Sequence, residues 1–307
     1  MLTTIGLNNR GNRWFLFASR LLHGLKTRVT FMNARPLDLS RCAIHTQTTK
    51  PWSLAQCIEG YGRAGIRGIS VWRDVIEPVG AEQAGKMLRD AGMQVPALVR
   101  GGFFVAQDAM ARRSAIDVNL RRIDEASAIG AQMVVLVCGA APGVALPEAR
   151  KHVTEGIAAV LPRARSAGVK LAIEPLHPMY AADRSCINRM AEARLVCEQL
   201  ADPMLGIAVD VYHVWWDPDL QNEIELAGRQ KTLFAFHVCD WRVPTRDLLT
   251  DRGLMGEGCI DIRTIRSWVD KTGFDGPIEI EVFSQDYWSM DQNEYVARIA
   301  EAFLSHS

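Results

Sequence analysis

A short unit repeats along most of this chain: a helical pattern, then a glycine, then a run of apolar residues. Five segments carry it, namely AGIRGISV (64–71), AGMQVPAL (91–98), IGAQMVVL (129–136), AGVKLAIE (167–174) and TGFDGPIEIE (272–281). Glycine readily adopts the left-handed backbone conformation that ends many helices, and a short continuous apolar run is typical of a parallel strand buried on both faces. The repeat therefore predicts alternating helices and parallel strands joined by right-handed crossovers.

Eight strands can be placed from residue 37 onward. They are Arg41–Gln47, Arg67–Trp72, Gln94–Arg100, Gln132–Cys138, Lys170–Glu174, Leu205–Asp210, Thr232–Val238 and Pro277–Val282. Between them apolar residues recur every three or four positions, which predicts amphipathic helices. Eight such units in about 250 residues fit a closed (β/α)8 TIM barrel of the α/β class. The alternative is an open doubly wound sheet, but no Gly-x-Gly-x-x-Gly follows the first strand. We expect residues 37–307 to form a single barrel domain.

The first 36 residues differ in composition from the rest of the chain, with six basic residues and no acidic one. An arginine-rich, acid-free segment resembles a transit peptide. The simpler interpretation is an extension upstream of the working start, with Met32 as the initiator. We expect residues 1–36 to lie outside the fold.

Composition also limits the partners and the compartment. After residue 36 the chain has 29 basic and 35 acidic residues, and this negative excess argues against a nucleic-acid partner. No apolar run approaches the ~20 residues that span a bilayer. Seven cysteines, never in a Cys-x-x-Cys pair, are typical of reduced, buried thiols. We expect a cytoplasmic protein that binds a small molecule.

Four of the predicted strands end in a side chain that can bind a metal ion or a proton. These are Glu174 in VKLAIEPLH, Asp210 in LGIAVDVYH, His237 in LFAFHVCDWR and Glu281 in PIEIEVF. The carboxyl ends of barrel strands meet at one mouth, so we expect these groups to share one volume. Three carboxylates repel one another unless a cation lies among them. An oxygen-rich set with one nitrogen suits Mn²⁺, our leading candidate, or Mg²⁺ or Co²⁺.

Such a metal site predicts enzymatic chemistry on a sugar. A metal with open positions can hold a carbonyl and an adjacent hydroxyl, polarise the carbonyl and stabilise an enediolate. A carboxylate on the rim can serve as general base. We expect an isomerase or epimerase of a ketose or keto-polyol. The alternative is a lyase or dehydratase that shares the first step and then eliminates a β-substituent.

These motifs, together with GEGCID (256–261), resemble the xylose isomerase-like TIM-barrel superfamily over about Arg41 to Phe303. That superfamily includes ketose 3-epimerases, hydroxypyruvate isomerase and inosose dehydratase. The resemblance implies that Glu174, Asp210, His237 and Glu281 are divalent-metal ligands. It also implies that Glu174 and Glu281 act as the acid/base pair on opposite faces of the substrate.

The resemblance further implies that His213 and Arg242 bind substrate oxygens, and that the chain forms a dimer or tetramer. In the epimerase branch a second glutamate follows the first ligand by six positions, whereas this chain has Tyr180 there. Arg100 closes a predicted strand and His177 follows Glu174, so we expect them to contact substrate. Asp240 could bind a second metal or face solvent, but we expect it to orient His237.

Two further functions remain open. An apurinic-site endonuclease has a similar barrel but needs a three-metal cluster, many more histidines than the seven present here and a basic DNA groove. A barrel that only binds a sugar without catalysis would keep the pocket and lack the metal.

Overall fold

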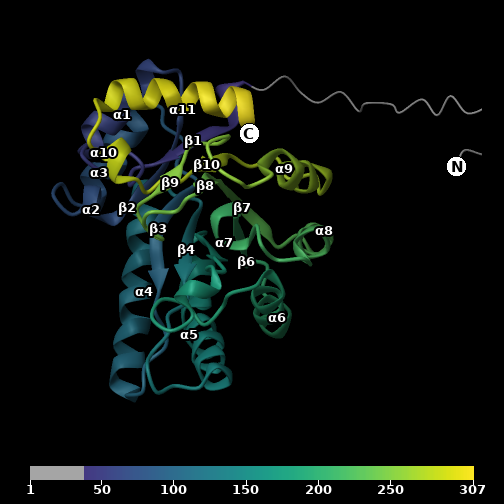
Figure 1. The fold of residues 1–307 in the computed structure, drawn as a ribbon. Helices are drawn as coiled ribbons and strands as arrows, with labels where there is room; N and C mark the ends of the chain where they lie inside the picture. The colour runs from purple at the N-terminus through teal and green to yellow at the C-terminus, as the bar shows by residue number, and fades with distance from the viewer. Residues whose placement is uncertain (1–37) are drawn as a thin grey trace, which may run out of the picture. The chain divides into compact units, whose positions relative to one another are not determined.

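The structure is a computed structural model that describes residues 38–307. The predicted extension over residues 1–36 lies outside the described residues, so its role stays a prediction. Within the described part, eight parallel strands close into a barrel surrounded by helices (Figure 1). The predicted fold class, a (β/α)8 TIM barrel, is confirmed.

The barrel strands are β1 (Cys42–His45), β2 (Gly68–Trp72), β3 (Ala97–Gly102), β4 (Met133–Val137), β5 (Lys170–Ile173), β6 (Leu205–Asp210), β7 (Leu233–Val238) and β10 (Ile278–Ile280). Each pairs with its neighbour in chain order, and β1 pairs with β10 in parallel to close the ring. All eight predicted strands are present. Most ends differ by one to three residues, and β6 has the predicted bounds.

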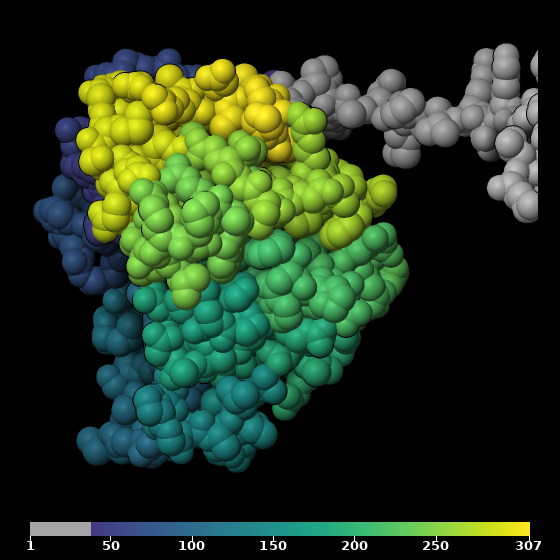
Figure 2. Space-filling view, in the orientation of Figure 1, coloured from purple at the N-terminus to yellow at the C-terminus, as the bar shows by residue number. Residues whose placement is uncertain are grey.

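The longer helices lie outside the ring. They are α1 (Leu54–Arg63), α3 (Ala81–Asp90), α4 (Ala109–Ile129), α5 (Leu146–Ala167), α6 (Met190–Leu200), α8 (Leu220–Gln230), α9 (Ile262–Lys271) and α11 (Gln292–His306). The last helix, α11, packs against α1 and against residues 39–41, so it lies beside the first described residues (Figure 2). Of the helices in residues 38–307, none is both long enough and apolar enough to cross a membrane.

Glycine ends the helices as the repeat predicts. The first glycine of each of the five repeat segments has a positive φ, between 64° and 83°. At Gly130, the C-cap of α4, the backbone N–H donates to the carbonyls of Ala126 and Ser127. The left-handed turn lets the chain leave the helix and enter β4 three residues later, at Met133. These turns set the alternation of helix and strand around the ring.

Successive side chains on each strand point alternately outward and into the barrel. Outward residues such as Ile173 and Val209 pack against the helices in the main core. The inward side chains form a second cluster of small and medium apolar residues: Ala97, Val99, Met133, Val135, Ala172, Ala208 and Ala235. The position two residues after an inward alanine points the same way. This spacing places Glu174, Asp210 and His237 inside the barrel at its carboxyl end.

Shorter elements lie between the barrel strands and the outer helices. They are η1 (Leu39–Arg41), α2 (Arg73–Ile76), η2 (Pro178–Tyr180), α7 (Val211–Val214), α10 (Gln285–Trp288) and an antiparallel pair formed by β8 (Asp240–Trp241) and β9 (Arg252–Gly253). The sequence did not predict the β8–β9 pair, and this pair contributes to the site. All seven cysteines are unpaired; six are buried, as predicted, and Cys259 is exposed.

Candidate active site

The four predicted ligands come together at the carboxyl end of the barrel. One ligand atom from each of Glu174, Asp210, His237 and Glu281 lies within 4.8 Å of all the others. All four side chains are buried, and those of Asp210 and His237 are completely inaccessible to solvent. The barrel geometry therefore concentrates three carboxylates and one imidazole in a buried volume.

This donor set fits a divalent cation. Ligands bonded at about 2.0–2.6 Å to one ion lie up to about 5 Å apart across it, which matches the observed spacing. The Nδ1 atom of His237 lies 3.0 Å from Oε1 of Glu174, and its buried Nε2 has no hydrogen-bond partner among the described residues. A set dominated by carboxylate oxygens favours Mn²⁺, Mg²⁺ or Co²⁺ over a structural zinc site rich in thiolates.

A buried arginine, which the sequence did not reveal, lies against these ligands. Arg252 at the start of β9 donates from Nη1 to Oε2 of Glu281 at 2.9 Å and to Oδ2 of Asp210 at 3.4 Å. Its guanidinium lies 4.2 Å from the ring centre of Tyr212 and 4.6 Å from that of Phe283. Arg252 is therefore a fixed positive charge beside two of the four predicted ligands.

Burial and neighbouring charges shift the pKa values of these groups in different directions. Burial raises the pKa of Asp210 to about 7, although the charge of Arg252 opposes the shift. Burial also raises the pKa of Glu281. The neighbouring His45 and Arg252 outweigh this effect and hold the pKa of Glu281 well below its usual value. For His237 burial lowers the pKa, yet the surrounding glutamates raise it to about 10. In the absence of a metal the site is thus a network of paired buried charges.

A second layer of polar side chains lies deeper in the barrel. Glu279, which points inward two residues before Glu281, accepts a hydrogen bond from Ser70 and lies 3.3 Å from Nε2 of His45. Nδ1 of His45 lies 3.1 Å from Oε1 of Glu281 and 3.1 Å from Nε1 of Trp72. These contacts fix the carboxylate of Glu281 from below.

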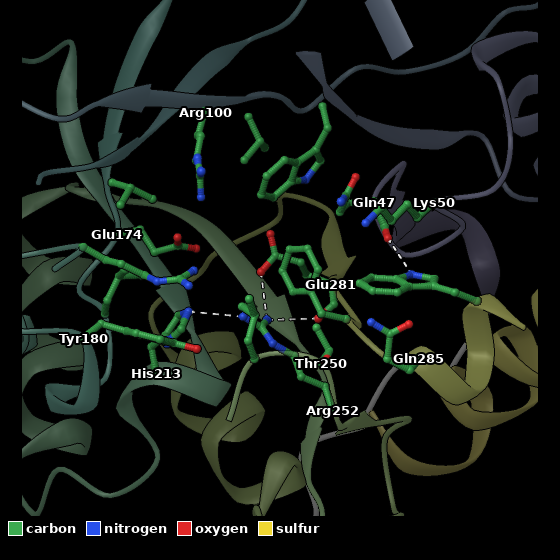
Figure 3. A pocket seen from close by; sticks show the side chains of 18 residues that line it. Gln47, Lys50, Arg100, Glu174, Tyr180, His213, Thr250, Arg252, Glu281 and Gln285 are labelled. Carbon is green, nitrogen blue, oxygen red and sulfur yellow. Dashed lines mark hydrogen bonds and ion pairs between the residues drawn. The ribbon is translucent and has the colours of Figure 1, made fainter. Parts of the chain in front are cut away.

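A cavity of about 260 Å³ opens above the ligands (Figure 3). Its volume is just below the ~300–1,000 Å³ typical of drug-sized ligands, so it suits a molecule of monosaccharide size. The cavity is lined by Gln47, Lys50, Trp72, Val99, Arg100, Val137, Glu174, Leu176, Tyr180, Arg184, His213, Leu249, Thr250, Arg252, Glu281, Phe283, Gln285 and Trp288. Among the four ligands, only Glu174 and Glu281 belong to this lining.

Two of the four predicted substrate-binding residues, His213 and Arg100, line the cavity. His213 accepts the backbone N–H of His177 at Nδ1, at 3.3 Å, while its Nε2 lies 3.7 Å from Asp210. Burial and the charge of Arg252 lower the pKa of His213 well below its usual value. His177 is outside the lining and supports His213 through its backbone.

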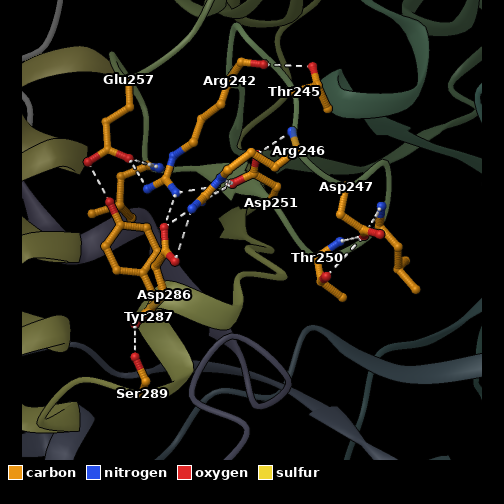
Figure 4. A network of polar contacts seen from close by, with 12 residues as sticks. Arg242, Thr245, Arg246, Asp247, Thr250, Asp251, Glu257, Asp286, Tyr287 and Ser289 are labelled. Atoms are coloured by element: carbon orange, nitrogen blue, oxygen red, sulfur yellow. Dashed lines mark hydrogen bonds and ion pairs between the residues drawn. The ribbon is translucent and has the colours of Figure 1, made fainter.

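The structure does not bring Arg242, the fourth predicted substrate-binding residue, into the cavity. Its guanidinium donates to Glu257 at 2.8 Å, to Asp286 at 3.2 Å and to Asp251 at 3.5 Å (Figure 4). Arg246 also donates to Asp251 and Asp286. This network anchors the segment between β8 and β9, which carries the cavity residues Leu249 and Thr250 and leads into Arg252.

Tyr180 lines the cavity as well, at the position where the epimerase branch has a glutamate. Its hydroxyl donates to the carbonyl of Leu248 at 3.0 Å, and the hydroxyl of Tyr212 donates to the same carbonyl at 2.9 Å. Tyr180 therefore supports the β8–β9 segment from inside the mouth.

The expectation that Asp240 orients His237 is wrong. Its carboxylate accepts the backbone N–H groups of Trp241, Gly256 and Ile260 at 2.9–3.0 Å. It therefore fixes the glycine-rich turn after β9. Asp240 follows His237 by three residues. Because successive side chains of an extended chain point in opposite directions, Asp240 points away from the face that bears His237.

A profile of the xylose isomerase-like TIM barrel family matches residues 61–305 of the chain. The chain belongs to this family. The resemblance inferred from the motifs is thereby confirmed.

Several solved structures are similar to this chain. Protein SMc04130 from Sinorhizobium meliloti 1021 is 47% identical, with a TM-score of 0.84 over 87% of this chain and 98% of that one. A structure of the IolI protein with a bound zinc atom is 18% identical, with a TM-score of 0.75 over 85% of this chain and 96% of that one. At this lower identity the likeness shows the fold alone.

An inosose isomerase from Halalkalibacterium halodurans is 24% identical over 136 residues. The match covers 43% of this chain and 46% of that enzyme, so this family member aligns over about half the length of its curated relative.

Proposed function

We propose that this protein is a divalent-metal-dependent isomerase or epimerase of a ketose or keto-polyol. The observation that carries the proposal is the division of the four ligands into two pairs. Asp210 and His237 are sealed behind the cavity, whereas Glu174 and Glu281 also face it. Two carboxylates that border both the metal site and the substrate space are suited to transfer protons.

Glu174, Asp210, His237 and Glu281 would hold the cation, with Mn²⁺ as our first choice. When bound, the cation would polarise the substrate carbonyl and reduce the cost of the negative charge that forms on its oxygen. Glu174 and Glu281 reach the cavity from separate strands, β5 and β10, so they would contact the substrate from different sides (Figure 3). One removes the proton next to the carbonyl, and the other delivers a proton, to the opposite face of the same carbon in an epimerisation or to the former carbonyl carbon in an isomerisation.

Other residues of the cavity would prepare the substrate for this transfer. His213, whose lowered pKa keeps it neutral near pH 7, can hydrogen-bond a sugar hydroxyl through Nε2, which also lies 3.4 Å from Nη2 of Arg252. Trp72, Phe283 and Trp288 supply apolar walls that exclude water, and the faces of aromatic rings pack well against the C–H surface of a sugar. Arg252 would hold Glu281 in its ionised, proton-accepting form.

The partial match to an inosose isomerase supports a keto-polyol as the substrate class. A lyase would share the same ligands and the same first proton transfer and would then eliminate a β-hydroxyl. The product separates the two reactions, because a lyase yields an unsaturated compound and an isomerase does not.

The test is a screen of ketoses and keto-inositols in D₂O with Mn²⁺, with deuterium uptake followed by NMR. We expect exchange at one carbon next to a carbonyl, and a loss of roughly 10²–10⁴-fold in rate for Glu174→Gln and Glu281→Gln. The matched control is Glu301→Gln, which changes an exposed carboxylate on α11. Metal content measured on each variant separates loss of the ion from loss of proton transfer.

Two results would overturn the proposal. One is exchange at the unaltered rate in both glutamine variants. The other is a protein that binds sugars but neither retains nor responds to Mn²⁺, Mg²⁺ or Co²⁺, which would indicate a sugar-binding barrel without catalysis.

A further inference from the structure

The cavity is lined by more positive than negative charge. Its basic residues are Lys50, Arg100, Arg184 and Arg252, and its only acidic residues are Glu174 and Glu281. Both acids belong to the candidate metal site, where a bound cation would neutralise them. A neutral sugar would not require this excess of positive charge.

Within the described part of the chain, Arg100 and Arg184 lack the close carboxylate partners that Arg252 has. Arg252 is paired with buried carboxylates, but the Arg100 side chain makes no hydrogen bond or ion pair with any residue from 38 to 307. It lies against the rings of Trp72 and Phe103, 5.6 Å and 5.0 Å from their centres. The guanidinium of Arg100 therefore keeps its N–H donors free toward the cavity.

Arg184 is similarly available. It lies 4.7 Å from the ring centre of Tyr180, and its nearest carboxylate is that of the exposed Asp183, at a long 3.7 Å. Loss of water around Arg100, and next the positive charge of Arg184, lowers the pKa of Arg100. Two arginines thus face one cavity close enough to repel each other, and Glu281 and Glu174 offset only part of the resulting shift at Arg100.

This arrangement matches the recognition of an oxyanion. A planar guanidinium presents a fork of donors that fits the paired oxygens of a carboxylate or a phosphoryl group. An anion placed between the two arginines would relieve their repulsion and supply the acceptors that they lack. Across the cavity Gln47 has a buried Oε1 atom without a partner among the described residues, which suits a sugar hydroxyl (Figure 3).

We propose that Arg100 and Arg184 bind an anionic group at one end of the substrate, whose carbonyl end lies at Glu174 and Glu281. The substrate class is then a keto-sugar that carries a carboxylate or a phosphoryl group. This inference rests on the proposed function, since the keto-sugar comes from it. The anionic group comes from the two arginines.

Binding can be tested without turnover. The full-length protein, loaded with Mn²⁺ and dialysed free of excess ion, is titrated calorimetrically with three unreactive analogues: a hexitol, the same hexitol with a terminal phosphate, and the corresponding hexonate. We expect at least one anionic analogue to bind roughly tenfold or more tightly than the hexitol, as charge-assisted hydrogen bonds imply. The preferred anion identifies the group as phosphoryl or carboxylate.

Variants show whether the two arginines produce this preference. Arg100→Gln and Arg184→Gln should each remove most of the preference for the anion and leave hexitol affinity within about twofold. Arg113→Gln, at an exposed arginine of α4 outside the cavity lining, should bind all three analogues like the unaltered protein. A hexitol affinity equal to that of both anions, or a preference that survives in both variants, overturns the inference.

The two proposals fail in different ways. If no ketose, neutral or anionic, exchanges deuterium while the preference for anions persists and depends on both arginines, the proposed function is wrong and the anion site stands. If a neutral hexulose exchanges as efficiently as its phosphorylated and carboxylated counterparts, the anion site is wrong and the proposed function stands.

Discussion

Replacement of Arg252 by methionine tests whether its guanidinium is the built-in counter-charge of the candidate metal site. Methionine keeps much of the length and apolar surface of arginine but removes the charge. Nη1 of Arg252 lies 2.9 Å from Glu281 and 3.4 Å from Asp210, and none of these three side chains is more than 4% exposed. In the variant the carboxylates of Glu281 and Asp210 therefore stay buried, but the positive charge that paired with them is gone.

The expected effect on stability is large. Unit charges about 4 Å apart attract each other by about 4 kcal/mol at an effective dielectric constant near 20. Removal of one partner from a buried pair typically costs about 3–5 kcal/mol, because the remaining charge is left uncompensated. We expect a loss of this size in the free energy of unfolding of the metal-free variant at about pH 8, above the pKa of about 7 of Asp210.

A bound cation would replace part of the missing charge. Mn²⁺ at a hundredfold its Kd stabilises a folded protein by about 2.7 kcal/mol, and we expect a larger gain in Arg252→Met than in the unaltered chain. The measurement is urea unfolding followed by tryptophan fluorescence, in EDTA and in Mn²⁺. Arg113→Met, at an exposed ion pair, should change stability by no more than about 0.5 kcal/mol. If Arg252→Met is as stable as the unaltered protein in EDTA, the electrostatic reasoning is refuted.

Three further predictions concern pH, packing and metal. In EDTA the free energy of unfolding, measured by urea unfolding, should fall as pH rises from about 6.5 to about 8.5. The reason is that His237, whose pKa is raised to about 10, keeps a proton in the folded state that the unfolded chain releases. The variant His237→Gln should flatten this dependence on pH. Gly258→Ala should destabilise the protein by roughly 1–3 kcal/mol, since a Cβ atom there would lie 2.2 Å from the carbonyl oxygen of Trp241, and thermal unfolding would show the loss. EDTA should lower the Tm, and Mn²⁺ should restore it in a concentration-dependent way; calorimetry with no such shift would contradict a metal site.

The barrel and the convergence of Glu174, Asp210, His237 and Glu281 could be predicted from the sequence because both follow from local patterns. Apolar runs and the glycines that precede them mark each strand, and a strand in a parallel barrel must end at the common mouth. Glu174 and Asp210 are the first ionisable residues at the ends of such runs, so their convergence followed from the fold. Glu279 also has a sequence signal. It is a charged residue that alternates with isoleucine in a strand expected to be buried, and this pattern predicts a buried polar partner.

Arg252 could not be predicted in this way. It lies in a polar segment, TDRGLMGEG, without a helical or strand period, and its position depends on the pairing of β9 with β8. That pairing is a tertiary contact held by the ion pairs of Arg242 and Arg246. The family resemblance pointed to Arg242 as the substrate-binding arginine. In the structure Arg242 instead anchors the segment that delivers a different arginine.

The sealed position of Asp210 and His237 has a kinetic consequence under the proposed function. A cation can reach these two groups from the cavity by passing Glu174 and Glu281, and a substrate bound above would close that route. The ion would therefore enter before the sugar and leave after it. Saturating substrate should then slow the loss of metal to a chelator, in the manner of a compulsory-order reaction.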